Sequence, residues 1–287
     1  MKFCMVGIGG MGLLFTKYFK EKAKELFLYD VNLVKAKSIA EQLNLYYFES
    51  LEQAINNSDL IFLAIPIEEI KKILDLLHSM NKGRDMIVCE ISSTKRGIYE
   101  KLRLLAGEGL TTLCLHPLFG PGGERLKRKK MVYIPVKDDN KEKTLVREIF
   151  QDFDIIPLSY GEHERLMAYI LCLTHIINLA FIKSLPKEEI KRLFSLAGST
   201  FFFQMILAGS VLNDDQKLLS SIHMENLYSS EVLDSLIEEL KKLKVLIDKK
   251  DKENYEAIIK ELRGKISDFS LTEELYKKMY LILEKLF

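Results

Sequence analysis

A strong charge of either sign is absent from this chain of 287 residues, and that absence argues against polyanionic partners. The 42 Lys and Arg residues nearly cancel the 41 Asp and Glu residues, so the formal net charge is +1 at pH 7. Proteins that bind nucleic acids or anionic membranes usually carry a clear basic excess. The composition is 48% hydrophobic and 29% charged, which is typical of a folded globular protein. The charge balance therefore gives no reason to expect a nucleic acid or a membrane as a partner, and we expect neither.

Cysteine is scarce, and its spacing excludes the usual metal and redox motifs. The four cysteines, Cys4, Cys89, Cys114 and Cys172, are far apart in apolar runs, and no two of them form a C-x-x-C pair. Buried reduced thiols in a cytoplasmic protein explain this pattern. We expect no metal.

Long hydrophobic runs are missing as well. The longest, residues 170–182, is interrupted by Thr174, His175 and Asn178 and is shorter than the ~20 residues that a membrane span needs. Four glycines between residues 7 and 12 interrupt the apolar start of the chain, so it does not resemble a signal peptide. The sequence predicts a soluble cytoplasmic protein.

The first half of the chain alternates strand-like and helical patterns. Between the strands lie helical patterns at 11–24, 34–43 and 67–79. Short apolar or β-branched runs occur at 3–6, 25–29, 60–65, 86–91, 110–115, 131–136 and 154–158. This alternation predicts an α/β domain over residues 1–160, a Rossmann-type, doubly wound and mostly parallel sheet with helices on both faces.

After Tyr160 only helical patterns remain. No repeat, low-complexity tract or flexible linker separates the two halves. Amphipathic stretches cover 162–185, 188–212, 214–248, 252–262 and 272–287. We expect an all-helical second domain over residues 161–287, and a cleft between the two domains as the ligand site.

A glycine-rich loop follows the first strand and reads G-x-G-x-x-G. Gly7 permits the tight turn, Gly9 lets the backbone approach a pyrophosphate, and Gly12 allows close packing of the next helix. The pyrophosphate would bind at the N-terminus of that helix. The residues expected to contact it are Gly7, Ile8, Gly9, Gly10, Met11 and Gly12.

Asp30 ends the second strand-like run, 18 residues after Gly12. An acidic residue about 20 positions beyond the loop accepts hydrogen bonds from the ribose hydroxyls of a dinucleotide, although Asp30 could instead cap a helix. Its charge would repel a 2′-phosphate, and Val31 and Asn32 offer no cation, so NAD is expected rather than NADP. Ala64 and Pro66, in and just after the run 60–65, complete the expected cofactor site.

A histidine stands where the strand-like run 110–115 ends. His116 is followed by a proline, which favours an extended backbone, and then by a loop of two prolines and three glycines within residues 117–123. Open α/β sheets bind ligands at this carboxyl edge. A rigidly held imidazole there could take a proton from a hydroxyl while hydride leaves the same carbon, or it could be structural.

These residues together resemble the prephenate dehydrogenase family. The segment H-P-L-F-G-P at 116–121 is similar to the H-P-M-F-G-P signature of that family. The loop at 7–12, the segment I-S-S-T-K at 91–95 and the segment E-H-E-R-L-M-A at 162–168, which leads to His175, agree with it in order. The resemblance covers most of the chain, including the helical half.

The resemblance implies NAD(P)-dependent oxidative decarboxylation of prephenate to 4-hydroxyphenylpyruvate, a reaction of tyrosine biosynthesis. It implies that His116 is the catalytic histidine that hydrogen-bonds the ring hydroxyl, and that Ser93 orients this histidine near the nicotinamide. His175 matches a second active-site histidine from the helical domain. The resemblance also implies a homodimer formed through that domain.

Two further features of the helical half bear on the site. Thr174, His175 and Asn178 form a polar arc on an apolar helix, so they face either a ligand or another helix. We include all three in the expected substrate site. His163 belongs to a Glu-His pair that the family also has, but a capping or first-turn role explains it equally well.

The resemblance implies a small-molecule dicarboxylate as substrate, because prephenate carries two carboxylates, and the chain departs from the family at the arginine that usually binds a carboxylate. That arginine directly follows a glycine, and here the matching pair is Gly209-Ser210. Arg125, in the basic run 124–130 after the histidine loop, is the first substitute, although such a run is often only a solvated face. No segment resembles the chorismate mutase or ACT domains that are sometimes fused to these enzymes.

Three other functions stay open. An arogenate dehydrogenase would use the same scaffold and chemistry. A 3-hydroxyacid or imine reductase often relies on a lysine in the helical domain, and the arc from Thr174 to Asn178 has none. A non-catalytic NAD-binding protein would explain Ser210.

Overall fold

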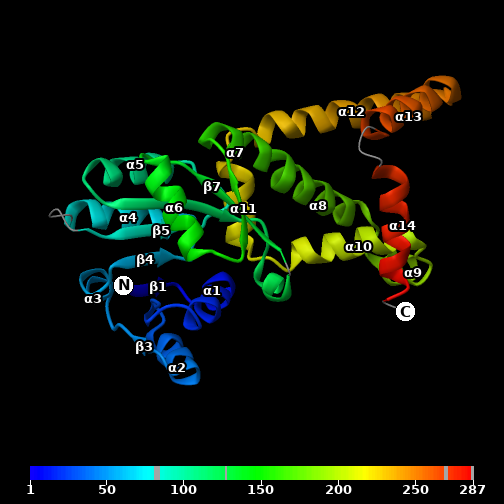
Figure 1. Ribbon diagram of the computed structural model, residues 1–287. Coiled ribbons are helices and arrows are strands. Elements are labelled where there is room, and N and C mark those ends of the chain that lie inside the picture. The colour runs from blue at the N-terminus through cyan, green and yellow to red at the C-terminus, as the bar shows by residue number, and fades with distance from the viewer. Residues whose placement is uncertain (81–84, 127, 268–270, 286–287) are drawn as a thin grey trace. The chain divides into compact units, whose positions relative to one another are not determined.

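The computed structural model describes residues 1–80, 85–126, 128–267 and 271–285, and it divides the chain into two compact units. The first unit is Met1–Met167 with Lys217–Leu227, and the second is Ala168–Gln216 with Tyr228–Phe287. In Figure 1 the first unit is coloured from blue to green, and the segment Lys217–Leu227, which also belongs to it, is yellow.

The first unit is built on one sheet of eight strands in the order β3-β2-β1-β4-β5-β6-β7-β8. Neighbouring strands are parallel except β6 and β7, which are antiparallel. The strands are β1 (Lys2–Val6), β2 (Glu25–Tyr29), β3 (Tyr46–Tyr47), β4 (Leu60–Leu63), β5 (Ile87–Glu90), β6 (Thr111–Pro117), β7 (Lys129–Ile134) and β8 (Phe153–Pro157). The predicted Rossmann-type, mostly parallel sheet is confirmed. Strand β3 was not predicted, because two residues are too few to give a periodic pattern.

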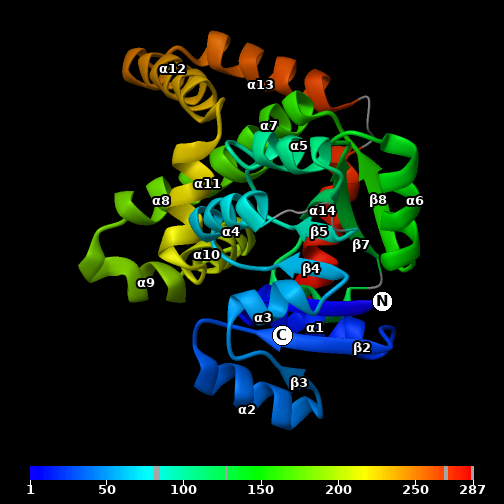
Figure 2. The ribbon, with the colours of Figure 1, turned by 90° about the vertical axis from the view of Figure 1, so that its left-hand side faces the viewer.

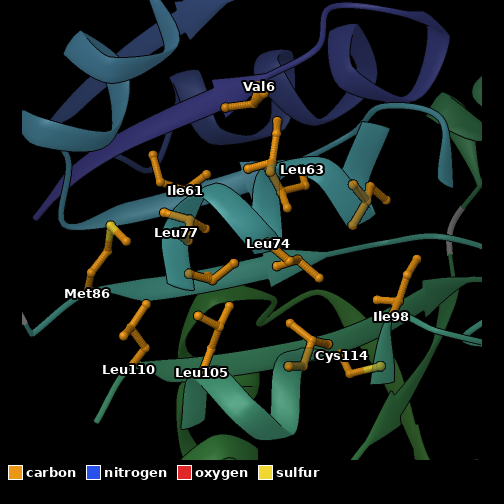
Figure 3. Close-up of a cluster of buried hydrophobic side chains, with 14 of the residues drawn as sticks. Val6, Ile61, Leu63, Leu74, Leu77, Met86, Ile98, Leu105, Leu110 and Cys114 are labelled. Carbon is orange, nitrogen blue, oxygen red and sulfur yellow. The ribbon is translucent and has the colours of Figure 1, made fainter. Parts of the chain in front are cut away.

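Helices cover both faces of this sheet, because the central strands are apolar on both sides. On one face, side chains of β1, β4, β5 and β6 pack with those of α4 and α5, as Figure 3 shows for Ile61, Leu74, Leu105 and Cys114. On the other face the strands pack against α1, α2 and α6. The helices of this unit are α1 (Gly10–Lys20), α2 (Leu33–Leu43), α3 (Leu51–Asn56), α4 (Ile67–Met80), α5 (Tyr99–Gly107), the short η1 (Pro121–Arg125), α6 (Asp139–Ile149), α7 (Tyr160–Met167) and α11 (Gln216–Glu225).

The strand order of the sheet reverses between β1 and β4. The chain moves outward from β1 through β2 to β3, then returns to β4 on the other side of β1. Doubly wound sheets bind ligands at the carboxyl edge where the strand order reverses in this way. The segments that follow β1, β2, β4, β5 and β6 all leave the sheet at that edge.

The second unit is entirely helical within the residues that the structure describes. Helices α12 (Ser229–Lys249) and α13 (Lys252–Ser267) lie side by side as a hairpin in Figures 1 and 2. The elements are η2 (Ala168–Leu173), α8 (Thr174–Ser184), η3 (Lys187–Glu189), α9 (Ile190–Ser195), α10 (Ser199–Leu212), α12 (Ser229–Lys249), α13 (Lys252–Ser267) and α14 (Leu271–Leu283). Residues 286 and 287, the end of the last predicted helix, lie outside the described residues.

Three predicted long helices are interrupted. The stretch 162–185 contains a turn of π-helix, η2, between α7 and α8. The stretch 188–212 breaks before α10, whose N-cap is Gly198, and 214–248 breaks between α11 and α12. Apolar periodicity continues across such short breaks and therefore does not reveal them.

The two units are not separated at a single position in the sequence, because each consists of two segments of the chain. Helix α7 and helix α11 both group with the sheet. The side-chain nitrogen of Asn226 donates to the carbonyl of Glu164 at 2.7 Å, and Lys71 on α4 pairs with Glu225 at 2.8 Å. The division at residue 160 stays a prediction.

The helical segment Tyr160–Ser184 is longer than the apolar run that the sequence suggested. It has 25 residues and, by length and composition alone, could cross a membrane. A core helix of a soluble protein passes the same test, so this is weak support for a span.

Candidate active site

The loop between β1 and α1 has the backbone that a dinucleotide-binding turn requires. Gly7 has a φ of +89°, which L-residues with side chains rarely adopt, and its N–H donates to the Tyr29 carbonyl at 2.8 Å. A Cβ atom at Gly12 would lie 1.9 Å from the carbonyl oxygen of Gly7, so α1 can start here only with glycine at that position. Gly7 and Gly12 are therefore needed for the fold itself.

The remaining glycines of the loop leave space for a ligand and for a neighbouring loop. A Cβ at Gly9 would meet no atom within 4 Å, and Gly9, the N-cap of α1, provides no side-chain cap. A Cβ at Gly10 would lie 2.6 Å from Pro121, which belongs to the loop after His116. No acidic residue occupies the first turn of α1, in which Met11 is half-buried. An uncapped helix N-terminus of this kind fits a pyrophosphate.

Asp30 is hydrogen-bonded to this loop. One carboxyl oxygen accepts from the N–H of Ile8 at 2.8 Å, and the other accepts from the N–H of Asn32 at 2.9 Å. The N-cap of α2 is Asn32, so Asp30 does not serve as the cap. Each carboxyl oxygen can accept a second hydrogen bond, which is what recognition of a ribose would use.

Ala64 and Pro66 lie at the same edge. The N–H of Ala64 donates to the carbonyl of Val6, so Ala64 directly adjoins the start of the loop. Pro66 is exposed and immediately precedes α4. Both residues follow β4, where the strand order reverses, and a Cβ at Gly7 would lie 2.6 Å from the carbonyl oxygen of Ala64.

His116 is the sixth residue of β6 and is buried, with 3% of its surface exposed. Its Nδ1 lies 2.9 Å from Nε2 of His163 on α7. Burial lowers the pKa of His116 well below its usual value, and the charges of His163 and Lys95 lower it further. The imidazole is therefore neutral at physiological pH and able to accept a proton.

His163 is fully buried and makes a second contact. Its Nδ1 lies 3.0 Å from Oε1 of Glu164, which also accepts from the backbone N–H of Lys95 at 3.0 Å. Burial lowers the pKa of His163, although the Glu164 carboxyl opposes that shift. The sequence left a capping role open for His163, but its side chain joins the site of His116 instead.

A buried ion pair fastens the segment after β5 to the strand that holds His116. The Lys95 ammonium, with no exposed surface, lies 2.7 Å from Glu90 and also donates to the carbonyls of Ser92 and Leu115 at 2.7 and 2.5 Å. The other carboxyl oxygen of Glu90 accepts from the N–H and the hydroxyl of Ser92. These bonds fix the backbone that directly precedes His116.

Ser93 is half-buried in this segment, at the carboxyl end of β5. Among the described residues, no hydrogen bond joins Ser93 to His116, whose Nδ1 lies beside His163. The orienting role that the resemblance implies for Ser93 stays a prediction. Sequence reasoning missed the roles of Lys95, Glu90 and Glu164. A charged residue inside the apolar run 86–91 was the one available signal for the buried pair.

Arg125, the first candidate for a cationic ligand, lies in the segment that follows the histidine loop. Arg125 is exposed at the end of η1, next to Glu124, which pairs with Lys17 at 3.3 Å. Lys127 lies outside the described residues, and Lys129 already belongs to β7. Ser210 is exposed on α10. Within the described ranges, no three His, Cys, Asp or Glu side chains gather as a metal site.

The polar arc of Thr174, His175 and Asn178 lies on α8 in the second unit, and its three side chains differ in burial and in contacts. Asn178 is buried; its amide donates to the carbonyl of Thr174 at 2.8 Å and accepts from Gln204 of α10 at 2.8 Å. That amide therefore holds α8 to α10. Thr174 is exposed, and His175 is half-buried, with a pKa that burial lowers and Asp214 raises.

Two family models match the chain in sequence order. Residues 15–154 match the model described as prephenate dehydrogenase, nucleotide-binding domain. Residues 159–261 match the model described as prephenate dehydrogenase, dimerization domain. Among curated proteins, the chain is 21% identical over 263 residues to "Probable arogenate/prephenate dehydrogenase" of Methanocaldococcus jannaschii. That alignment covers 89% of this chain and 58% of the length of that relative.

Solved structures share the fold. Prephenate dehydrogenase from Aquifex aeolicus, in complex with hydroxyphenyl propionate and NAD+, has a TM-score of 0.76 at 21% identity and covers 94% of this chain and 98% of its own. Synechocystis arogenate dehydrogenase has a TM-score of 0.69 at 18% identity, over 94% of this chain and 100% of its own. Because two models of one family match most of the sequence in order, the chain belongs to the prephenate dehydrogenase family.

Proposed function

We propose that this chain is an NAD-dependent dehydrogenase that oxidises and decarboxylates prephenate to 4-hydroxyphenylpyruvate, a reaction of tyrosine biosynthesis. One observation carries the proposal: the buried, neutral imidazole of His116 lies at the sheet edge that also holds the dinucleotide-type loop. Pro121, from the loop after His116, packs against Gly10 of the other loop. Membership of the family and the NAD+ bound to the Aquifex aeolicus relative support the same conclusion.

Different residues of the proposed site would bind different parts of NAD+ and of the substrate. The amides at the start of α1 and the carboxyl group of Asp30 would hold the pyrophosphate and the adenosine ribose of NAD+. The strands β1 and β6 are three spacings apart, about 14 Å, a distance that an extended dinucleotide can span. When bound, NAD+ accepts the hydride. The chain itself supplies orientation and a proton acceptor.

His116 would act on the ring hydroxyl. As hydride leaves the carbon that bears this hydroxyl, its proton moves toward the imidazole, and the C–O bond gains carbonyl character. The ring carboxylate then leaves as CO₂, its bonding electrons make the ring aromatic, and the proton returns to the oxygen of the phenol. A neutral histidine with a lowered pKa suits this brief transfer, because it rarely starts out protonated.

Arogenate is the second candidate substrate. The name of the Methanocaldococcus jannaschii relative includes both substrates, and the Synechocystis structure is of an arogenate dehydrogenase. The two compounds differ in the side chain, an amino acid in place of a keto acid, so the chemistry at His116 is the same for both.

The deciding experiment follows NADH absorbance with each substrate. Purified protein is mixed with NAD+ and either prephenate or arogenate, and the ratio of the two kcat/KM values gives the substrate. An imine reductase would instead oxidise a reduced cofactor with cyclic imines. Tight NADH binding without turnover of either cyclohexadienyl compound would contradict the proposal and favour a binding protein.

We also infer a homodimer formed through the helical unit. The model that matches residues 159–261 describes a dimerization domain. Large apolar side chains are exposed there, among them Leu240, Ile247, Leu275 and Leu281. Light scattering coupled to gel filtration measures the mass directly, and a monomer at micromolar concentration would rule the dimer out.

A further inference from the structure

Three buried side chains form an unbroken hydrogen-bonded series at the end of β6. His116 Nδ1 lies 2.9 Å from His163 Nε2, and the two rings are nearly perpendicular, at 76°. His163 Nδ1 lies 3.0 Å from Glu164 Oε1. The exposed fractions of these residues are 3% for His116 and 0% for the other two. Water therefore does not compete for these contacts, and each ring nitrogen must be either a donor or an acceptor.

One backbone amide determines which atom donates and which atom accepts in each hydrogen bond of the series. The N–H of Lys95 can only donate, and it donates to Glu164 Oε1 at 3.0 Å, so that oxygen is an acceptor. His163 Nδ1, which faces the same oxygen, must then carry a hydrogen. A neutral His163 has its lone pair on Nε2, and this nitrogen can only accept. His116 must therefore carry its hydrogen on Nδ1.

We propose that His163 and Glu164 are positioning residues that hold His116 in its Nδ1–H tautomer and leave Nε2 as the atom that accepts the hydroxyl proton of the substrate. This inference rests on the proposed function, since it assigns the reacting atom of the proposed base. The opposite tautomer would present an N–H to the substrate and could not accept a proton at Nε2.

The arrangement has the logic of the serine protease triad, in which a buried carboxylate orients a histidine through Nδ1. There, a variant that stabilises the wrong tautomer loses about 10⁴-fold in kcat. Here the carboxyl group acts through a second imidazole. When His116 takes up the proton, its Nδ1–H bond to His163 strengthens, and the Glu164 carboxylate stabilises the charge along the series.

The surrounding structure fixes the series at both ends. Lys95 is held by its bonds to Glu90 and to the carbonyl of Leu115, so the amide that sets the direction does not move. At the other end His116 lies in the register of β6 with β7, opposite Val132.

The test compares two substitutions at one position. His163→Gln keeps an amide oxygen that can accept from His116 Nδ1–H, whereas His163→Leu removes the acceptor. We expect the leucine variant to lose about 10²- to 10⁴-fold in kcat, the contribution of a general base, with KM for NAD+ little changed. We expect the glutamine variant to recover most of that loss. His78→Leu, an exposed position on α4, serves as the control with unchanged kcat.

The variant Glu164→Gln separates the effect of the negative charge of Glu164 from the effect of the tautomer of His116. Because Lys95 N–H requires an acceptor at Oε1, the amide oxygen should take that place, and the direction of the series stays the same. The variant then lacks only the negative charge. We expect a smaller loss in kcat than in His163→Leu, with the tautomer of His116 unchanged.

The tautomer itself is read without catalysis. In protein labelled with ¹⁵N at histidine, NMR chemical shifts distinguish protonated from bare ring nitrogens. We expect His116 protonated at Nδ1 and bare at Nε2 in the wild type and in the glutamine variant. The opposite assignment in the wild type, or wild-type kcat in His163→Leu, would overturn the inference. Failure of the wild type to reduce NAD+ with either substrate would count against the proposed function alone, because the NMR result does not depend on turnover.

Discussion

At the scale of single residues, the proposed active site contains an imidazole that burial keeps uncharged. His116 could accept a proton near neutral pH from any position, but an exposed histidine would be partly protonated at the pH of the cell. Burial and the nearby ammonium of Lys95 lower its pKa well below the usual value. The cost is the loss of solvation, which the hydrogen bond to His163 partly offsets.

His116→Asn tests this residue directly. Asparagine places an N–H near the position of Nδ1 and can still donate to His163, so the fold should be retained. It has no basic nitrogen, and we expect kcat to fall by about 10²- to 10⁴-fold. Affinity for NAD+, measured by fluorescence titration of the binary complex, should change little. Near-normal turnover in this variant would remove His116 from the mechanism.

Asp30→Ala tests recognition of the ribose. Losing hydrogen bonds to a charged group should weaken NAD+ binding by roughly 10- to 100-fold, and the preference over NADP+ should narrow because the repulsive charge is gone. The matched control is Asn32→Ala, which removes the cap of α2 without touching the carboxyl group. Unchanged cofactor preference in Asp30→Ala would contradict the ribose assignment.

Residues that act through local geometry were predictable, and residues that act through distant partners were not. The glycine loop and His116 are each recognisable within a dozen neighbours in sequence. The partnership of His116 with His163 spans 47 positions, and that of Lys95 with Glu164 spans 69. No periodicity encodes such pairs, because they depend on how α7 packs on the sheet.

At the scale of elements, the turn from β1 into α1 contains two kinds of glycine. Gly12 is needed for the fold, whereas Gly9 is expected to be needed only for ligand binding. We expect Gly12→Ala to destabilise the protein by about 1–3 kcal/mol, as overpacking does, because its Cβ would collide with the Gly7 carbonyl. Gly9→Ala should unfold at the same denaturant concentration as the wild type, since its Cβ meets open space.

Affinity for NAD+ tests the role of Gly9 in binding. Gly9→Ala should weaken NAD+ by about tenfold or more, equivalent to about 1.4 kcal/mol, because the methyl group would occupy the path of the pyrophosphate. Urea denaturation and NAD+ titration of both variants provide the comparison. Equal NAD+ affinity in Gly9→Ala and the wild type would show that the pyrophosphate does not bind over this residue.

Element types were predictable where burial is uniform. The apolar strands of the sheet were all recognised except β3, and their order placed the expected site at one edge. Breaks in the helical half were not recognised, because the apolar stripe continues through η2 and past Gly198. Thr174, His175 and Asn178 all follow η2 within α8, so the turn of π-helix does not alter their spacing relative to one another.

At the scale of the whole molecule, the buried histidines link stability to pH. The pKa of His116 and that of His163 are both lowered in the folded protein, mainly by burial. In the unfolded chain each regains its ordinary pKa of about 6.5. Below that pH the unfolded chain binds protons that the folded protein does not, so acidification favours unfolding.

The prediction is a loss of stability between about pH 6.5 and pH 5, above the range in which ordinary carboxyl groups titrate. For each histidine that stays neutral in the fold, the free energy of unfolding should fall by about 1.4 kcal/mol per pH unit once the unfolded chain is fully protonated. Guanidinium denaturation at a series of pH values measures the slope. His116→Asn removes one of the histidines whose pKa burial lowers and should reduce that slope while leaving stability at pH 7 to 8 nearly independent of pH. An identical slope in wild type and variant would mean that His116 takes up a proton inside the fold at its ordinary pKa, which would contradict the lowering that burial causes.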